Sequence, residues 1–251
     1  MRNRPMFGVL GAICMMAVLG SLTRVQAGGA PDQKIRVVVT TGGHDFQRKE
    51  FFAMWDSLPG VVYRESTMGK SAEAYTAENL KDCDVLATYD MAQKITDEQK
   101  AAFLGFLKRG GGLVVLHHSM ISQQDWPEYE RIAGVKYFLK PETRDGKEYP
   151  KSGYQHDVDM RIHVADPKHP ITEGMSDFDI HDEAYSGYLV NPKVHVLLTT
   201  DHPKSGKIIG WTRDEGQARV AVIALGHDGK AYADPNFKKI VERAIKWAGK
   251  R

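Results

Sequence analysis

Residues 110–119 read Gly-Gly-Gly-Leu-Val-Val-Leu-His-His-Ser: a glycine turn, a short apolar run and two adjacent histidines. A continuous Leu-Val-Val-Leu run bounded by glycines is typical of a strand buried on both faces, as in a parallel sheet. In open α/β sheets, ligands bind just beyond the carboxyl ends of such strands. His117 and His118 stand at that position, so the sequence predicts a functional site there.

Strand and helix patterns alternate on both sides of this run. Apolar runs predict strands at residues 35–41, 61–64 and 84–89, and helical spacing predicts helices at 46–58 and 236–248. Thr96 and Gln99 have the spacing of a capping box, which predicts the start of a helix that ends at Gly110. The alternation indicates the α/β class, with a mostly parallel central sheet.

The second half of the chain has a different pattern. Helical spacing continues over residues 124–134, whereas residues 141–155 are polar and contain glycine, which predicts a surface excursion. Apolar and polar residues alternate over 158–164, as expected of a half-solvated strand. Strands at 195–200, 207–212 and 219–225 follow at short intervals and are expected to be partly antiparallel. Because neither a repeat nor a linker interrupts the pattern, we expect one domain over residues 28–251.

The first 27 residues have a basic start, an apolar stretch from Met6 to Leu19 and the ending Val25-Gln26-Ala27. These are the features of a secretory signal peptide cleaved after Ala27, and an uncleaved anchor is the alternative. We therefore expect an exported protein, periplasmic or secreted, with no membrane attachment after cleavage. The segment holds three basic residues and no acidic one, so the remaining 31 basic and 32 acidic residues give a formal charge of −1.

Charge and cysteine content exclude several classes of protein. No cluster of lysine and arginine is long enough to follow a phosphate backbone, so nucleic acid is not an expected partner. Cys14 lies in the predicted signal peptide, and only Cys83 remains after cleavage. A single cysteine forms neither an internal disulfide nor a cysteine zinc cage, so a hydrophobic core must stabilise the fold.

Several chemically active side chains follow the predicted strands. His44 follows the first strand, and His227 follows the strand at 219–225. Because the ends of parallel strands meet at one edge of a sheet, we expect these side chains to converge with His117. The segment His181-Asp182-Glu183, beside Tyr185, adds carboxylates that bind metals or transfer protons. The alternative is that each is an ordinary loop residue bonded to the backbone.

The other histidines and one tryptophan carry weaker signals. His163 alternates with apolar residues and is expected to face solvent, while His169 and His202 precede prolines in predicted turns. His195 begins a strand and is expected to be structural. Trp126 and Tyr185 are candidate stacking surfaces for a sugar, with packing in the core as the alternative.

Five motifs in order carry a resemblance to a known family. They are Thr41-Gly42-Gly43-His44-Asp45-Phe46, Gly110-Gly111-Gly112-Leu113-Val114-Val115-Leu116-His117, His169-Pro170-Ile171-Thr172-Glu173-Gly174, Asp182-Glu183-Ala184-Tyr185 and Arg219-Val220-Ala221-Val222-Ile223-Ala224-Leu225-Gly226-His227. Over residues 35–249 the chain resembles the ThuA-like, or trehalose-utilisation, family. The resemblance implies a three-layer flavodoxin-like fold of the class I glutamine amidotransferase type, with helices on both faces of the sheet.

The same resemblance implies a role in sugar metabolism, with trehalose and keto-sugars among the substrates. It also implies a set of site positions, whereas His118 and His181 lie outside the family pattern. The implied positions are His44, His117, Asp182, Glu183 and His227.

The chain departs from the amidotransferases of this superfamily at one position. Those enzymes carry a nucleophilic cysteine on the turn after the corresponding strand, where this chain has His117-His118-Ser119. Cys83 precedes a different strand and is expected to be buried, so the usual thiolate mechanism is excluded. Ser119 lacks the Gly-x-Ser-x-Gly pattern of a serine nucleophile. We therefore do not expect an amidotransferase.

The favoured hypothesis is an exported carbohydrate-processing enzyme acting on a glycoside or keto-sugar by metal-assisted or acid/base chemistry. Its predicted catalytic residues are Asp182, Glu183 and His117, and its predicted substrate-binding residues are His44, Trp126 and Tyr185. A divalent metal, zinc before others, is expected to be bound by His44, His117, His227 and Glu183.

Two alternatives stay open. One is a non-catalytic sugar-binding protein that uses the same cleft. The other is a scaffold domain of a carbohydrate-degradation system. The sequence predicts no oligomeric state.

Overall fold

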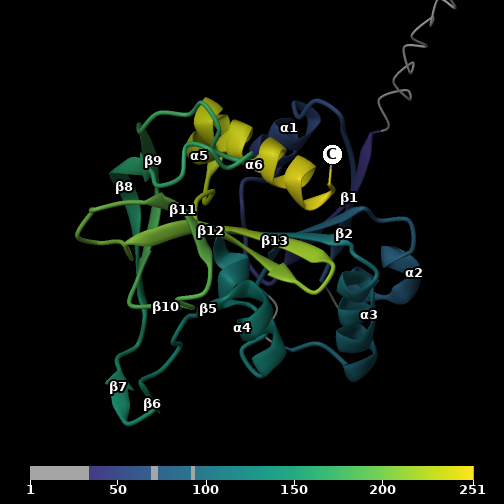
Figure 1. Cartoon of the computed structure of the whole chain (residues 1–251), viewed down its shortest axis with the longest axis horizontal. Coiled ribbons are helices and arrows are strands. Elements are labelled where there is room, and N and C mark those ends of the chain that lie inside the picture. Colours follow the sequence, from purple (N-terminus) through teal and green to yellow (C-terminus); the bar gives the residue numbers. More distant parts are fainter. Residues whose placement is uncertain (1–33, 69–72, 92–93, 251) are drawn as a thin grey trace, which may run out of the picture. The chain divides into compact units, whose positions relative to one another are not determined.

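The computed structural model describes residues 34–68, 73–91 and 94–250 (Figure 1). The predicted signal peptide at 1–27 lies outside these residues, and both the cleavage site and the single domain at 28–251 stay predictions. No helix in the described part of the chain is long and apolar enough to cross a membrane.

Helices and strands alternate along the first half of the chain, and strands dominate the second half. The elements of the first half are β1 (Ile35–Gly42), α1 (Arg48–Asp56), β2 (Val61–Thr67), η1 (Glu73–Tyr75), α2 (Ala77–Leu80), β3 (Val85–Asp90), α3 (Asp97–Lys108), β4 (Gly112–Leu116), η2 (His117–Ile121) and α4 (Pro127–Ala133). Those of the second half are β5 (Val135–Lys136), β6 (Glu142–Arg144), β7 (Lys147–Tyr149), β8 (Gly153–Val164), β9 (Phe178–Ser186), β10 (Leu189–Val190), β11 (His195–Thr199), β12 (Ile208–Glu215), β13 (Ala218–Ile223), α5 (Gly229–Ala233) and α6 (Pro235–Ala248).

Nine of the described strands form one sheet in the order β2-β1-β3-β4-β13-β12-β11-β8-β9. The pairs from β2 to β13 are parallel, and the pairs from β13 to β9 are antiparallel. Consequently only β12 and β8 run opposite to the other strands. The predicted α/β class with a large, mostly parallel sheet is confirmed, as is the antiparallel pairing expected in the second half.

The β4 strand lies inside the sheet, between β3 and β13. All five of its residues are buried, as its glycine-bounded apolar sequence predicts. Helix α6 packs against β4 and β13, and α4 also packs against β13. In Figure 1, α6 and α4 lie on opposite sides of β13, so both faces of this region are covered.

Local sequence explains where the two longest helices begin. At the start of α3, the Thr96 hydroxyl accepts the Gln99 N–H at 3.3 Å, and the Gln99 side chain accepts the Thr96 N–H at 2.8 Å. This is the predicted capping box, and it is confirmed. At the start of α6, the Asp234 carboxylate accepts two backbone N–H groups, and Pro235 stands in the first turn, where a missing N–H costs nothing.

The region between α4 and β11 differs most from the sequence prediction. Residues 142–149 form a small antiparallel hairpin, β6–β7, which projects away from the sheet at the lower left of Figure 1. The predicted excursion ends earlier than expected, because β8 already begins at Gly153. β9 is a strand that the sequence analysis missed, and it pairs with β8 from Gly153↔Ser186 to Ile162↔Phe178. Asp182 and Glu183 therefore lie within a strand and not in a strand-end loop.

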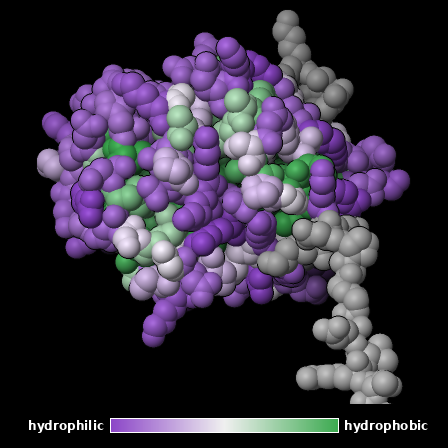
Figure 2. All heavy atoms as spheres, turned by 90° about the horizontal axis from the view of Figure 1, so that it is seen from above, coloured by the Kyte–Doolittle hydropathy of each residue, from purple (hydrophilic) through white to green (hydrophobic). Residues whose placement is uncertain are grey.

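Apolar residues of the sheet and helices form one continuous core in the described chain. On the face seen from above, hydrophilic residues cover most of the surface and apolar residues form only small patches (Figure 2). Burial in this core supplies the main stabilising term, as expected of a chain with a single cysteine in its predicted mature part.

Candidate functional site

His117 is the first residue of η2 and directly follows β4. Its backbone has φ 47°, in the left-handed region that residues other than glycine rarely adopt, and its side chain is fully buried. Its Nδ1 lies 2.8 Å from the carbonyl oxygen of Ala224, just after β13. Because a carbonyl only accepts hydrogen bonds, Nδ1 carries a hydrogen, and Nε2 faces the interior of the site.

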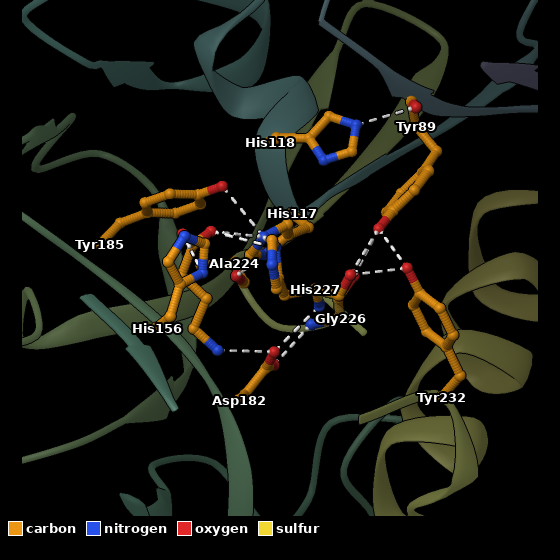
Figure 3. Close-up of polar contacts among 11 residues, drawn as sticks. Tyr89, His117, His118, His156, Asp182, Tyr185, Ala224, Gly226, His227 and Tyr232 are labelled. Atoms are coloured by element: carbon orange, nitrogen blue, oxygen red, sulfur yellow. Dashed lines mark hydrogen bonds and ion pairs between the residues drawn. The ribbon is translucent and has the colours of Figure 1, made fainter. Parts of the chain in front are cut away.

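Two further side chains meet His117 at this nitrogen (Figure 3). Its Nε2 lies 3.0 Å from Glu183 Oε2 and 3.1 Å from His227 Nδ1. His227 Nδ1 and Glu183 Oε2 are themselves 3.3 Å apart. We call His117, Glu183 and His227 the His-Glu-His cluster. Residues from η2, β9 and the segment after β13, far apart in the sequence, thus bring three polar atoms together.

Asp182 holds this arrangement in place from behind. Its two carboxylate oxygens accept the backbone N–H groups of Glu183 at 2.8 Å, Gly226 at 2.6 Å and His227 at 2.9 Å. Figure 3 shows the carboxylate directed at Gly226. Since both oxygens bind backbone groups, Asp182 fixes the position of His227 relative to β9.

The surroundings shift the pKa values of these groups in different directions. Burial raises the pKa of Glu183, but hydrogen bonds from His117 and His227 and their charges outweigh it, so that the pKa lies well below its usual value. The hydrogen bond to Glu183 raises the pKa of His227, against the opposing effect of burial. Burial raises the pKa of Asp182, and its backbone hydrogen bonds oppose that shift. Glu183 is therefore a charged carboxylate at neutral pH.

The donor set of the cluster fits a divalent metal. Glu183 Oε2 is a charged acceptor, so its 3.0 Å approach to His117 Nε2 requires a hydrogen on that nitrogen or a cation between the two atoms. Tetrahedral zinc with bonds of about 2.1 Å separates its ligands by about 3.4 Å, close to the three distances within the cluster. Two imidazoles and one carboxylate form a ligand set used by catalytic zinc sites, and the Ala224 carbonyl orients His117 as the outer shell of such sites does.

Tyr185 lies at the cluster, as the sequence analysis expected of a site residue. Its hydroxyl lies 3.0 Å from His117 Nε2, within hydrogen-bond distance, and its ring stacks on the imidazole with ring centres 4.8 Å apart. The side chain is only 4% exposed, so its ring face contacts protein. Burial and the charge of Glu183 raise the pKa of Tyr185, which keeps its proton in place.

His156 is a site residue that the sequence analysis missed. Its Nδ1 lies 3.1 Å from Glu183 Oε1, and its side chain is 52% exposed. The β8–β9 register shifts between Gln155 and Val158, and Asp157 has φ 55°. This bulge directs His156 toward Glu183, and bulges commonly re-aim side chains in this way. No sequence signal pointed to it, because the alternation of apolar and polar residues begins only at Val158.

His44 lies beside the cluster and outside its hydrogen-bonded part. Its ring stacks on His118 with centres 4.5 Å apart, and its centre is 6.0 Å from that of His227. His118 Nε2 donates to the carbonyl oxygen of Tyr89 at 3.0 Å. Among the described residues, neither His44 Nδ1 nor His118 Nδ1 has a hydrogen-bond partner. Burial lowers the pKa of both imidazoles, so they are neutral at pH 7.

Two residues singled out in the sequence lie away from the cluster. Trp126 is 6% exposed, and its ring packs against Phe103 and Tyr129. Such burial leaves little ring surface for a sugar. Trp126 is therefore packed in the core, which was the alternative to a sugar-stacking role. His181 lies on the outer side of β9, 2.8 Å from Asp159 and 3.1 Å from Asp157.

Neither alternative nucleophile is activated. Cys83 is buried, its thiol donates to the Val85 carbonyl at 3.0 Å, and burial raises its pKa to about 11. A thiol with such a pKa is a poor nucleophile at neutral pH. Ser119 is fully buried and donates to the Asp90 carbonyl at 2.6 Å.

The chain is similar in sequence and in fold to known proteins. A family model described as trehalose utilisation, ThuA, matches residues 34–248. No match was found among curated proteins. A ThuA-like protein from Parabacteroides merdae superposes with a TM-score of 0.72 at 17% identity, covering 86% of this chain and 90% of that one. A ThuA-like protein from Bacteroides uniformis gives 0.66 at 19%, covering 89% and 94%.

A part of a larger enzyme has a similar fold. The β-galactosidase from Bacillus circulans sp. alkalophilus superposes with a TM-score of 0.57 at 11% identity, over 85% of this chain but only 31% of that one. At such identities the likeness extends to the fold alone.

Proposed function

Because the chain belongs to the ThuA, or trehalose-utilisation, family, we propose that it is a carbohydrate-processing enzyme acting on a glycoside or keto-sugar. The reaction uses metal-assisted or acid/base chemistry at the His-Glu-His cluster. The observation that carries this proposal is the meeting of His117 Nε2, Glu183 Oε2 and His227 Nδ1 within 3.3 Å of one another.

The pKa shifts divide the roles among the residues. A general base works best when its pKa lies near the working pH, and the pKa of Glu183 lies far below. Glu183 therefore acts as a fixed negative charge and a metal ligand, together with His117 and His227. Asp182 positions His227 and does not itself transfer protons, because both its oxygens hold backbone N–H groups.

Hydrogen-bond donation and proton transfer fall to two neighbouring groups, Tyr185 and His156. The Tyr185 hydroxyl keeps its proton and lies 3.0 Å from His117 Nε2, so it donates a hydrogen bond to developing negative charge. The half-exposed His156 imidazole is available to exchange protons with substrate and solvent. A bound divalent cation would supply Lewis acidity toward a carbonyl or glycosidic oxygen.

The proposal also excludes amidotransfer, and it includes a finer fold class and a cellular location. Amidotransfer by a thiolate is excluded, because His117 occupies the turn after β4 and Cys83 is buried with a raised pKa. We further propose the finer fold class, a three-layer flavodoxin-like arrangement of the class I glutamine amidotransferase type. Export to the periplasm or medium rests on the signal-peptide pattern of residues 1–27.

The decisive experiment is an activity screen with the purified protein. Disaccharides and their 3-keto derivatives are incubated with added zinc and after chelation, and products are followed by mass spectrometry. His117→Asn removes the imidazole with a side chain that tolerates the left-handed backbone, and Glu183→Gln removes the charge. We expect each variant to lower turnover on the order of 100-fold or more.

His163→Asn is the matched control, because His163 pairs with Asp177 on the surface at 2.8 Å and lies outside the cluster. Its turnover should equal that of the parent. Sugar binding without turnover in the parent protein would contradict the proposed enzymatic function and support the sugar-binding alternative. Absence of both binding and turnover would leave the scaffold alternative.

A further inference from the structure

Tyr154 is a large aromatic side chain that the fold leaves in solvent. It is 63% exposed, and in the described part of the chain only Val62 and Leu139 join it as exposed large hydrophobic residues. Exposing an aromatic ring forgoes the free energy of burying it. Its position beside the cluster gives this exposure a function.

A series of ring contacts connects Tyr154 to the His-Glu-His cluster. Its ring centre is 5.3 Å from that of His156, and the His156 ring centre is 4.8 Å from that of His227. On β9, the residue paired with Tyr154 is Tyr185, whose hydroxyl reaches His117. Tyr154 is therefore connected to the cluster through the ring of His156.

The surroundings of Tyr154 suit a sugar better than a protein partner. Gln155, His156 and Asp157 follow it and are all exposed, and Lys230 lies 3.3 Å from the Asp157 carboxylate. One aromatic ring among polar groups lacks the continuous apolar area of several hundred Å² that marks a protein-binding surface. An aromatic face beside hydrogen-bonding groups matches a pyranose, which has an apolar C–H face and a rim of hydroxyls.

We propose that Tyr154 is the stacking surface of a second sugar subsite. The reacting sugar lies at the His-Glu-His cluster, and the sugar linked to it lies against the Tyr154 ring. This inference rests on the proposed function, and it adds that the substrate has at least two sugar units. Tyr154 thus takes the stacking role that Trp126, buried against Phe103, is not placed to fill.

The experiment compares two substrates that differ by one sugar ring. KM and kcat are measured for 3-keto-trehalose and for methyl 3-keto-α-glucoside with the full-length protein and its variants. Tyr154→Ala should raise KM for the disaccharide about 10-fold, as the loss of one stacking contact implies, and leave KM for the methyl glycoside unchanged. Tyr154→Phe keeps the ring and should retain the parent values.

Leu139→Ala is the matched control, because Leu139 is also exposed, at 42%, and lies in the segment between β5 and β6. Thermal unfolding of each variant verifies folding. Equal KM changes for both substrates, or no change in Tyr154→Ala, overturn the inference while parent turnover upholds the proposed function. A parent protein inactive on every sugar contradicts the proposed function itself, and the inference with it.

Discussion

Asp182 and Glu183 are adjacent on β9, yet their surroundings shift the pKa values of their carboxyl groups in opposite directions. Asp182 faces backbone N–H groups in a fully buried pocket, and burial raises its pKa. Glu183 faces two imidazoles, and their hydrogen bonds and charges lower its pKa despite burial. The two neighbouring carboxylates thus have separate roles. Asp182 holds the backbone in position, and Glu183 contacts the imidazoles of the His-Glu-His cluster.

The substitution Asp182→Asn tests the positioning role. Asparagine keeps one acceptor oxygen, but its NH₂ group replaces the second one. That NH₂ would face a backbone N–H group whose hydrogen bond the Asp182 carboxylate accepts in the parent. We expect a loss of about 1–3 kcal/mol in the free energy of unfolding, measured by urea denaturation, because a buried donor is left unpaired. Turnover should fall as well, since Gly226 and His227 lose their anchor.

Asp179→Asn on the same strand is the control, because its carboxylate is 76% exposed and pairs only with Arg161 among the described residues. Its stability should change by less than about 0.5 kcal/mol. Equal stabilities of the two variants would show that the Asp182 contacts do not hold the site.

At this scale the sequence predicted part of the site and missed part. His117 and His227 could be found because each follows an apolar strand, and strand ends converge in this fold class. His156 could not be found, because its approach to Glu183 depends on a bulge that only the β8–β9 pairing defines. The burial of Trp126 depends on packing with Phe103, which no local pattern encodes.

Among the elements, the link from β13 to α5 contains a tightly packed glycine. Gly226 has φ 108°, and a Cβ atom there would stand 2.4 Å from the Phe237 ring. We expect Gly226→Ala to destabilise the fold by more than about 2 kcal/mol, through backbone strain and overpacking together, and to abolish activity. Chemical denaturation and the activity screen measure the two effects.

Gly146→Ala separates strain from overpacking. Gly146 has φ 74° in the β6–β7 hairpin, and a Cβ there meets no atom within 4 Å. This variant carries only the cost of the left-handed backbone, about 1 kcal/mol, and should keep full activity. A Gly226→Ala variant no less stable than Gly146→Ala would contradict the packing described here.

The contact between α1 and β2 provides a prediction about pH. Burial raises the pKa of Glu65, but hydrogen bonds from Arg48 and Thr41 lower it by more than burial raises it. The pKa of Glu65 therefore lies below its usual value. A carboxylate with a lowered folded-state pKa stabilises the fold above its unfolded pKa and loses that contribution as pH falls through the folded value. We expect Glu65→Gln to cost about 1 kcal/mol at pH 7.

This cost should shrink steadily as urea denaturation is repeated from pH 7 down to pH 3. The exposed Glu148→Gln variant in β7 serves as control, and its stability should change by less than about 0.5 kcal/mol. A cost for Glu65→Gln that is the same across this range would show that the charge of Glu65 contributes nothing.

Elements with local signals were predictable, and those defined by long-range pairing were not. The capping box at Thr96 and the buried β4 strand follow from a few neighbouring residues. β9 holds the charged residues Asp182 and Glu183 on its two opposite faces, and both are buried, so its sequence does not have the pattern of a strand. Its pairing with β8 creates that environment, and a pairing across so many residues leaves no local trace.

For the molecule as a whole, the proposed metal site depends on the completed sheet. His117 and His227 come from its parallel part, whereas Glu183 comes from the antiparallel part. The cluster therefore exists only in the folded chain, so a metal that binds it must stabilise the fold. We expect zinc at about 100 times its dissociation constant to add about 2.7 kcal/mol and to raise Tm by about 5–10 °C.

Differential scanning calorimetry with and without zinc measures this shift, and a chelator should reverse it. His117→Asn should abolish the shift while Cys83→Ala retains it, because the thiol is not part of the cluster. An undiminished shift in His117→Asn would place the zinc somewhere else in the protein.

The position of His117 is set by the backbone around it and not by the functional group of its side chain. β4, its buried neighbours β3 and β13 and the following η2 helix fix where a side chain at this point will stand, whatever its functional group. Exchanging the reactive atom at this one position leaves the hydrogen bonds of the sheet intact. A fold with such a position can acquire a new reaction through a single codon, and the architecture that surrounds this position remains a poor guide to the reaction it now supports.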